Sequence, residues 1–290
     1  KEPHVWTREY AITPHRFYVD HTRLFLRNPK PHMIFGDYSA STFWQWETVS
    51  HYQRYATVPA QIRHALPESK LIVMFRNPVK LWVTTISFPI HENIISSNRA
   101  VSSYFYFTRN SALPGNQTEL FHDAVVDRIA KAEECFRRYS LDQDGRVVLN
   151  KQLHRCLMGK KPRLFPGLYA LSLALWWKIF PKEQLLIVHS DEFFADPKPS
   201  VLQVLDHLSL STDQFWQRCG PVAYEKRASA PSVPVDPRTI ELLRKFYAPF
   251  NRVLADMLDD DRFLWDQWSW AYSYRLVVSD VYVWIQFRVI

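Results

Sequence analysis

Short apolar runs and longer amphipathic stretches alternate along this chain, and the alternation predicts an α/β fold. The runs at residues 71–75 and 184–189 are bounded by polar residues, as is typical of buried strands in a parallel sheet. Residues 119–139 place apolar side chains at three-and-four spacing, which predicts an amphipathic helix. The pattern also predicts a strand at 33–35 and helices at 61–66, 166–180, 199–208 and 238–258.

The segment at residues 70–87 carries the clearest candidate chemistry. Its strand stops at Arg76, and we expect Asn77 to cap the following helix with Pro78 in the first turn. Open α/β sheets bind ligands at the carboxyl ends of their strands, where Arg76 would lie. A helix N-terminus beside an arginine is a typical anion site, and Thr84 offers a hydroxyl two turns further on. The alternative is an ordinary strand–helix unit with a solvated arginine.

The composition and net charge of the chain indicate which classes of partner it could bind. The chain has 290 residues, 47% of them hydrophobic, which suffices for one large domain. Its net charge of +7 suits a polyanion such as nucleic acid, an anionic membrane or a sulfated glycan. We find no nucleic-acid-binding motif and no long basic block in the sequence. We therefore do not expect a nucleic-acid partner, and an anionic membrane or a sulfated glycan stays open at this point.

The three cysteines, Cys135, Cys156 and Cys219, lack metal-ligand spacing. In a secreted protein, Cys135 and Cys156 would close a loop worth about 3 kcal/mol, whereas three buried thiols remain the alternative. Asn116 begins a glycosylation sequon, which favours a secreted glycoprotein. The sequence contains no signal peptide and no transmembrane span, and it begins at Lys1 without methionine. We expect a fragment or a processed product.

The central segment resembles the 3′-phosphate-binding segment of sulfotransferases that use 3′-phosphoadenosine 5′-phosphosulfate (PAPS). In that family an R-[DN]-P turn is followed by a hydroxyl residue eight positions after the arginine, which Arg76 and Thr84 match. Residues 1–6, KEPHVW, resemble a segment of Golgi glycan sulfotransferases, including the heparan sulfate 3-O-sulfotransferases. The resemblance implies that Glu2 is the general base, with Lys1 and His4 holding charge on the sulfuryl group or acceptor.

Three further stretches resemble the same family. Residues 36–44, GDYSASTFW, are similar to an element of the N-acetylgalactosamine 4-sulfate 6-O-sulfotransferases, with aspartate in place of glutamate. Residues 167–170 and 243–251 resemble a family helix start and its closing helix. A family loop that closes over the nucleotide phosphates corresponds to Lys226 and Arg227, although the usual K-G-R pattern is absent.

The resemblance implies a sulfotransferase fold, a P-loop NTPase-like parallel sheet flanked by helices, over residues 1–268. The tail at 269–290 has no family counterpart and would be an added edge strand, a disordered end or a mistranslated exon. The family's donor loop for the 5′-phosphosulfate, with its strand, belongs upstream of residue 1 and is missing from this chain. We therefore expect this fragment to bind donor poorly and to be inactive alone.

The sequence thus predicts a carbohydrate sulfotransferase of the Golgi lumen, with a type II membrane anchor upstream. It would transfer a sulfuryl group from PAPS, without a metal, to the 6-hydroxyl of N-acetylgalactosamine 4-sulfate in chondroitin or dermatan sulfate. One alternative is an inactive sulfotransferase-fold module that binds anionic glycans. Another is a P-loop nucleotide kinase, which the absence of Walker motifs and of an acidic strand end disfavours. The acceptor sugar and the oligomeric state stay open.

Overall fold

The computed structural model describes residues 34–38, 42–44, 57–85, 117–139, 150–159, 164–219, 235–266 and 283–288. The chain forms two compact units. The first contains residues 1–76, 171–224 and 281–290, and the second contains 77–170 and 225–280. The division falls between Arg76 and Asn77, and again within α7 (Tyr169–Trp177).

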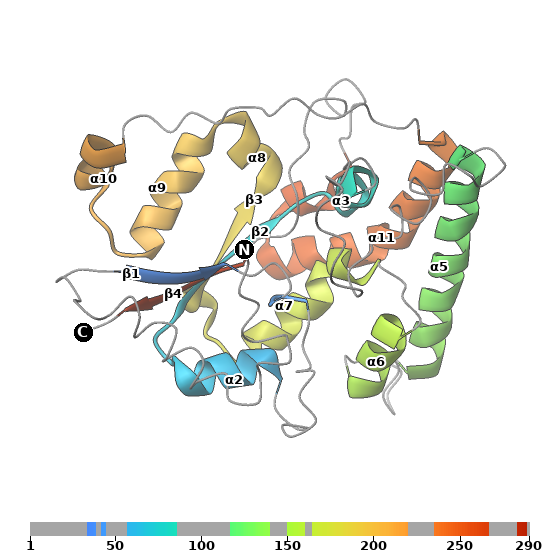
Figure 1. The fold of residues 1–290 in the computed structure, drawn as a ribbon, viewed down its shortest axis with the longest axis horizontal. Coiled ribbons are helices and arrows are strands. Elements are labelled where there is room, and N and C mark those ends of the chain that lie inside the picture. Colours follow the sequence, from blue (N-terminus) through green and yellow to red (C-terminus); the bar gives the residue numbers. More distant parts are fainter. Residues whose placement is uncertain are drawn as a thin grey trace, which may run out of the picture. The chain divides into compact units, whose positions relative to one another are not determined.

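A four-stranded sheet forms the centre of the first unit, in the order β1-β4-β2-β3 (Figure 1). Its strands are β1 (Ile34–Tyr38), β2 (Lys70–Phe75), β3 (Leu185–His189) and β4 (Val283–Arg288). The strands β2 and β3 are parallel, as the sequence predicts. Both β1 and β2 are antiparallel to β4, so β1, β2 and β3 run in one direction and β4 runs against them.

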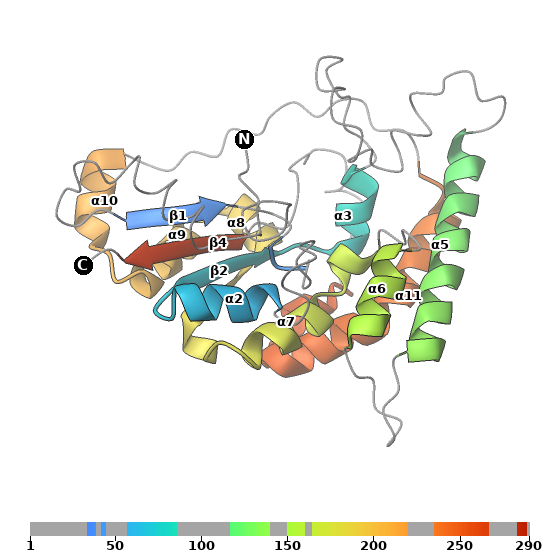
Figure 2. The same ribbon diagram turned by 60° about the horizontal axis from the view of Figure 1, so that its bottom comes forward.

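The strand β4 comes from the tail whose role the sequence left open. Residues 283–288 form a strand, although not the edge strand that the sequence analysis gave as one alternative. It pairs with β1 on one side and β2 on the other, and Figure 2 shows it between them. The predicted parallel pairing is found for β2 and β3, and β4 adds a strand that is antiparallel to both of its neighbours. The predicted boundary at residue 268 stays a prediction.

Both faces of β2 are covered, which explains its unbroken apolar run. Leu71, Val73 and Phe75 are at most 1% exposed, and Ile72 on the other face is 6% exposed. Phe43, in the turn at 42–44, packs its ring 5.4 Å from the ring of Phe75. Apolar contact on both faces fixes β2, and with it the position of the residue that follows.

The other elements described in the first unit are helices. It comprises α2 (Val58–Ala65), η4 (Lys182–Gln184), α8 (Ser190–Ala195), α9 (Pro197–His207) and α10 (Thr212–Cys219). The stretch at 166–180, predicted as one helix, instead begins with a separate 3-10 turn in the second unit before α7. In α7, Trp176 donates its indole N–H to the carbonyl of Phe43 at 2.9 Å, which holds the 42–44 turn in the core.

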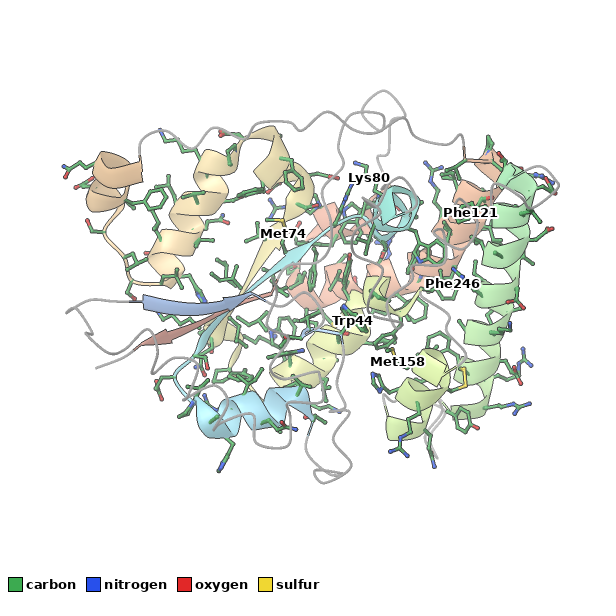
Figure 3. All side chains as sticks on the ribbon, in the orientation of Figure 1. Trp44, Met74, Lys80, Phe121, Met158 and Phe246 are labelled. Carbon is green, nitrogen blue, oxygen red and sulfur yellow. A yellow bond between two sulfur atoms is a disulfide. The ribbon has the colours of Figure 1, made fainter. Side chains whose placement is uncertain are left out.

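The second unit is built from helices. They are α3 (Pro78–Thr85), α5 (Gln117–Tyr139), α6 (Lys151–Gly159), η3 (Phe165–Gly167), α11 (Pro237–Leu258) and η5 (Asp261–Leu264). Phe136 and Phe250 pack α5 against α11 with ring centroids 5.3 Å apart. Cys135 on α5 and Cys156 on α6 form a disulfide, visible as the yellow bond in Figure 3. Of the two alternatives for these cysteines, the disulfide is the one found.

Candidate functional site

Arg76 directly follows β2 and lies at the carboxyl end of the parallel strand pair. Its side chain is buried, with 7% exposed, so the alternative of a solvated arginine is wrong. Phe75 pairs with His189 in the register of β2 and β3, so Arg76 and Ser190 are neighbours at this edge of the sheet. Buried guanidinium groups are kept where carboxylate, phosphate or carbonyl oxygens face them. The burial of Arg76 therefore agrees with a binding role.

Two buried hydroxyl groups lie in the same unit as Arg76. Ser190 and Thr42 are each 1% exposed, and neither hydroxyl has a hydrogen-bond partner among the described residues. Sequence reasoning placed Thr42 in a polar element but did not name Ser190. The only signal for Ser190 was its position directly after a buried strand, and that signal depends on knowing that β3 pairs with β2.

The start of α3 confirms the predicted cap, and the predicted anion site beside it stays a prediction. Asn77 is 4% exposed, and its Oδ1 accepts the backbone N–H of Val79 at 2.9 Å and of Lys80 at 3.3 Å. Pro78 has no N–H, and the N–H of Leu81 donates to the carbonyl of Asn77 at 2.8 Å. The first turn of α3 thus leaves no backbone N–H for a ligand. Hydrogen bonds to an anion here must come from side chains.

The other predicted site residues are not tested by the structure. Thr84 lies within α3, but its side chain is outside the described part of the chain. The segment with Lys1, Glu2 and His4 and the loop with Lys226 and Arg227 lie wholly outside the described residues. The roles assigned to these residues stay predictions.

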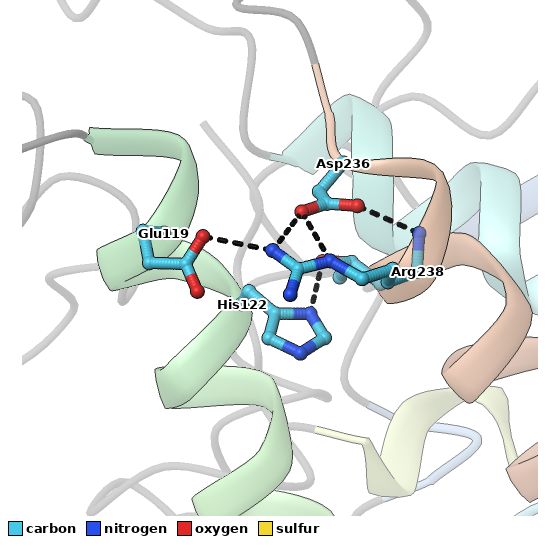
Figure 4. A network of polar contacts seen from close by, with 5 residues as sticks. Glu119, His122, Asp236 and Arg238 are labelled. Atoms are coloured by element: carbon cyan, nitrogen blue, oxygen red, sulfur yellow. Dashed lines mark hydrogen bonds and ion pairs between the residues drawn. The ribbon is translucent and has the colours of Figure 1, made fainter.

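A polar network joins the amino ends of α5 and α11 (Figure 4). Arg238 Nη2 lies 2.8 Å from Glu119 Oε2 and 2.6 Å from Asp236 Oδ2, and His122 Nδ1 lies 2.8 Å from Thr239 Oγ1. The hydrogen bond from the Arg238 side chain is the main cause that lowers the pKa of Asp236. Because Asp236 also caps α11 by accepting from the N–H of Arg238, the network serves helix capping and packing.

Two negative findings apply to the described residues. Among them, no three histidine, cysteine, aspartate or glutamate side chains are grouped so that they could hold a metal ion. Nor is any helix within the described ranges both long and apolar enough to cross a membrane.

A family model for a sulfotransferase domain matches residues 47–223, which include β2, Arg76 and β3. The chain belongs to the sulfotransferase family. The family membership and fold class predicted from the sequence are therefore confirmed. The match also agrees with the geometry, because the buried Arg76 and the capped start of α3 fall inside it.

Individual sulfotransferases show how far the similarity extends. Carbohydrate sulfotransferase 15 of Mus musculus is 28% identical over 302 residues, covering 91% of this chain and 49% of that protein. The Rattus norvegicus protein of the same name is 30% identical, covering 80% of this chain and 39% of its own length. The chain thus spans about half the length, or less, of these relatives.

A second group of relatives and a solved structure are also similar. Heparan sulfate glucosamine 3-O-sulfotransferase 3B1 of Homo sapiens is 30% identical, covering 34% of this chain and 30% of that protein. The crystal structure of a sulfotransferase from Alicyclobacillus acidocaldarius covers 70% of this chain and 61% of its own, at 20% identity and a TM-score of 0.39.

Proposed function

We propose that the protein containing this chain transfers a sulfuryl group from PAPS to a hydroxyl group of a glycosaminoglycan. One observation carries the proposal most directly. Arg76, in a chain of the sulfotransferase family, is a buried cation at the carboxyl end of a parallel strand, followed at once by a capped helix. This is the place where open α/β sheets bind nucleotides.

In this proposal Arg76 and Thr84 bind the 3′-phosphate of the donor. A guanidinium presents paired N–H donors that match two oxygens of a phosphate, and a threonine hydroxyl supplies a further donor. Because Asn77 already uses the first N–H groups of α3, these side chains supply the hydrogen bonds. Lys226 and Arg227 would neutralise phosphate charge from the loop that closes over the nucleotide.

The transfer itself is an in-line displacement at sulfur, similar in kind to phosphoryl transfer. The acceptor oxygen forms a bond to sulfur while the bond from sulfur to the 5′-phosphate oxygen breaks. Glu2 takes the proton of the acceptor hydroxyl, and 3′-phosphoadenosine 5′-phosphate (PAP) leaves with the bonding electron pair. Lys1 and His4 hold charge on the sulfuryl oxygens or the acceptor. The scheme involves no metal ion.

For the acceptor, we propose the 6-hydroxyl of N-acetylgalactosamine 4-sulfate in chondroitin or dermatan sulfate. Support comes from the similarity to proteins named carbohydrate sulfotransferase 15 and from the net charge of +7, which suits a polyanionic chain. The disulfide between Cys135 and Cys156 supports the oxidising lumen of the secretory pathway. We propose residence in the Golgi, with an anchor upstream of Lys1.

A transfer assay with the full-length protein tests the function. The protein is incubated with radiolabelled PAPS and with chondroitin 4-sulfate, desulfated chondroitin or heparan sulfate, and the products are digested to disaccharides. We expect label at the 6-position of 4-sulfated N-acetylgalactosamine. Label on heparan sulfate instead would keep the reaction and replace the acceptor. Glycan binding without PAP binding or transfer would favour the inactive glycan-binding module.

A further inference from the structure

An unusually close contact joins three segments of the second unit. Gly167 ends η3, and a Cβ atom built on it would lie 2.8 Å from Pro78 Cβ and 2.9 Å from Cε1 of Tyr247. Real Cβ atoms do not approach other heavy atoms this closely, so a larger residue at 167 would displace one of these neighbours. Glycine at this position lets the start of α3 and the middle of α11 approach the same backbone.

Tyr247 holds the other side of the contact. It is fully buried, and its hydroxyl donates to the carbonyl of Leu164 at 2.8 Å. The indole N–H of Trp82, on the second turn of α3, lies near this hydroxyl and acts to lower its pKa. Burial is the main cause that raises the pKa of Tyr247, which keeps the hydroxyl protonated.

The helix α3 is therefore held at two successive turns. Pro78, in the first turn, abuts Gly167. Trp82, in the second turn, lies near Tyr247. Its ring packs 6.1 Å from that of Phe121 on α5, and the guanidinium of Arg128 lies 5.3 Å from its centroid. Two contacts one turn apart define both the position of α3 along its axis and its rotation about that axis.

We propose that Gly167 and Tyr247 are positioning residues for the sulfuryl donor, acting through the placement of α3. The inference rests on the proposed function, in which Arg76 and Thr84 bind the 3′-phosphate. Arg76 directly precedes the cap residue Asn77, and Thr84 lies in α3 itself. Because the first turn of α3 has no N–H left for the ligand, binding depends on these side chains. In the proposed function, a shift of α3 would therefore weaken the hydrogen bonds to the 3′-phosphate.

The test compares two variants with a control in the full-length protein. Gly167→Ala adds a Cβ atom that would clash with Pro78 and Tyr247. Tyr247→Phe keeps the ring but removes the hydroxyl that donates to the carbonyl of Leu164. The control, Cys135→Ser with Cys156→Ser, loosens the same unit at the bond between α5 and α6. For each protein, calorimetry gives the Kd for PAP, thermal unfolding gives Tm, and transfer kinetics give kcat and the KM for each substrate.

We expect the Kd for PAP to rise about tenfold in Gly167→Ala and by a smaller factor in Tyr247→Phe. The kcat at saturating PAPS and the KM for the glycan should change less than twofold. The control should lower Tm at least as much while leaving the Kd for PAP unchanged. If both variants bind PAP like wild type, or if the control weakens PAP binding equally, the positioning role is wrong and the proposed function stands. If wild-type protein does not bind PAP, the proposed function itself fails, and this inference fails with it.

Discussion

At the scale of single residues, the two residues that follow β2 have different roles. Arg76 is charged and 7% exposed. The next residue, Asn77, caps α3 with its side chain. These different roles follow from the hydrogen-bond donors and acceptors that each side chain carries. Asn77 has an acceptor oxygen that suits backbone N–H groups, whereas Arg76 has only donors and suits an anion. The side chain of Asn77 thus stabilises the helix start, and Arg76 stays the proposed ligand for the donor phosphate.

Replacing Arg76 tests this assignment. Arg76→Ala should raise the KM for PAPS about 10- to 100-fold, because charge-assisted hydrogen bonds to phosphate contribute about 1.5–3 kcal/mol. Arg76→Lys keeps the charge but loses the paired donors, so its KM should lie between those of wild type and Arg76→Ala. The measurement is initial-rate kinetics at varied PAPS, with Tm as a control for folding. An unchanged KM in Arg76→Ala would contradict the role.

His207, at the end of α9, gives the first unit a predicted sensitivity to acid. Burial first, and then the charge of Lys70, lower its pKa below the usual 6.5. The unfolded chain therefore takes up this proton at a higher pH than the folded chain. The stability that His207 contributes is complete above about pH 6.5 and is lost as the pH falls through its lower folded value.

Thermal unfolding between about pH 7.5 and 5.5 checks this effect. Tm should fall with pH in wild type, and His207→Gln should flatten the dependence. His64, which is exposed on α2, offers a matched control. His64→Gln should leave the slope as in wild type, and an equal slope in all three proteins would exclude His207 as the cause.

At the scale of elements, the apolar and polar pattern within each segment predicts most of the helices and strands. It does not predict how these elements pack together. The apolar run of β2 and the spacing in α5 and α11 predicted these elements correctly, because each pattern lies within the element. The place of β4 could not be found this way, since strand order depends on pairing between distant residues. Gly167 matched a family motif, yet nothing in the local pattern indicates that it lies against Pro78 and Tyr247. Likewise, Ser190 gained meaning only from the register of β3 with β2.

Substitution within β4 tests its central place. Gln286 is aligned with Gly36 on β1 and with Lys70 on β2, so a proline there removes a donor from a strand that is paired on both sides. Gln286→Pro should destabilise the protein by about 1–3 kcal/mol through the unpaired backbone group, while Gln286→Ala should cost less than about 1 kcal/mol. Denaturant unfolding measures both. Equal effects of proline and alanine would show that β4 does not lie within the sheet.

At the scale of the whole molecule, the positive net charge should affect binding of the glycan more than binding of the donor. The chain carries +7, and a glycosaminoglycan is a long polyanion that contacts exposed charges. The donor is small and, in our proposal, held by the buried Arg76. Salt screens exposed charges strongly and buried ones weakly, since the Debye length falls from about 10 Å at 0.1 M to about 3 Å at 1 M.

Binding measurements at several salt concentrations separate these contributions. Between about 0.1 and 1 M NaCl, chondroitin sulfate affinity should fall at least about tenfold, whereas PAP affinity should fall by a smaller factor. Dermatan sulfate and desulfated chondroitin, which keeps only its carboxylate charges, serve as comparison ligands. Chondroitin sulfate binding that is insensitive to salt would show that charge does not drive glycan recognition.

The central position of β4 also governs the order in which the sheet is made. Ile34 pairs with Arg288, so β1 cannot pair with β4 until residues 283–288 have been synthesised. During synthesis, β2 and β3 can pair early, but β1 gains its partner only after residues 283–288 have left the ribosome. Pairings this distant in sequence slow folding. A change near the end of the chain is therefore expected to act on its beginning, and to appear first as a loss of yield during expression.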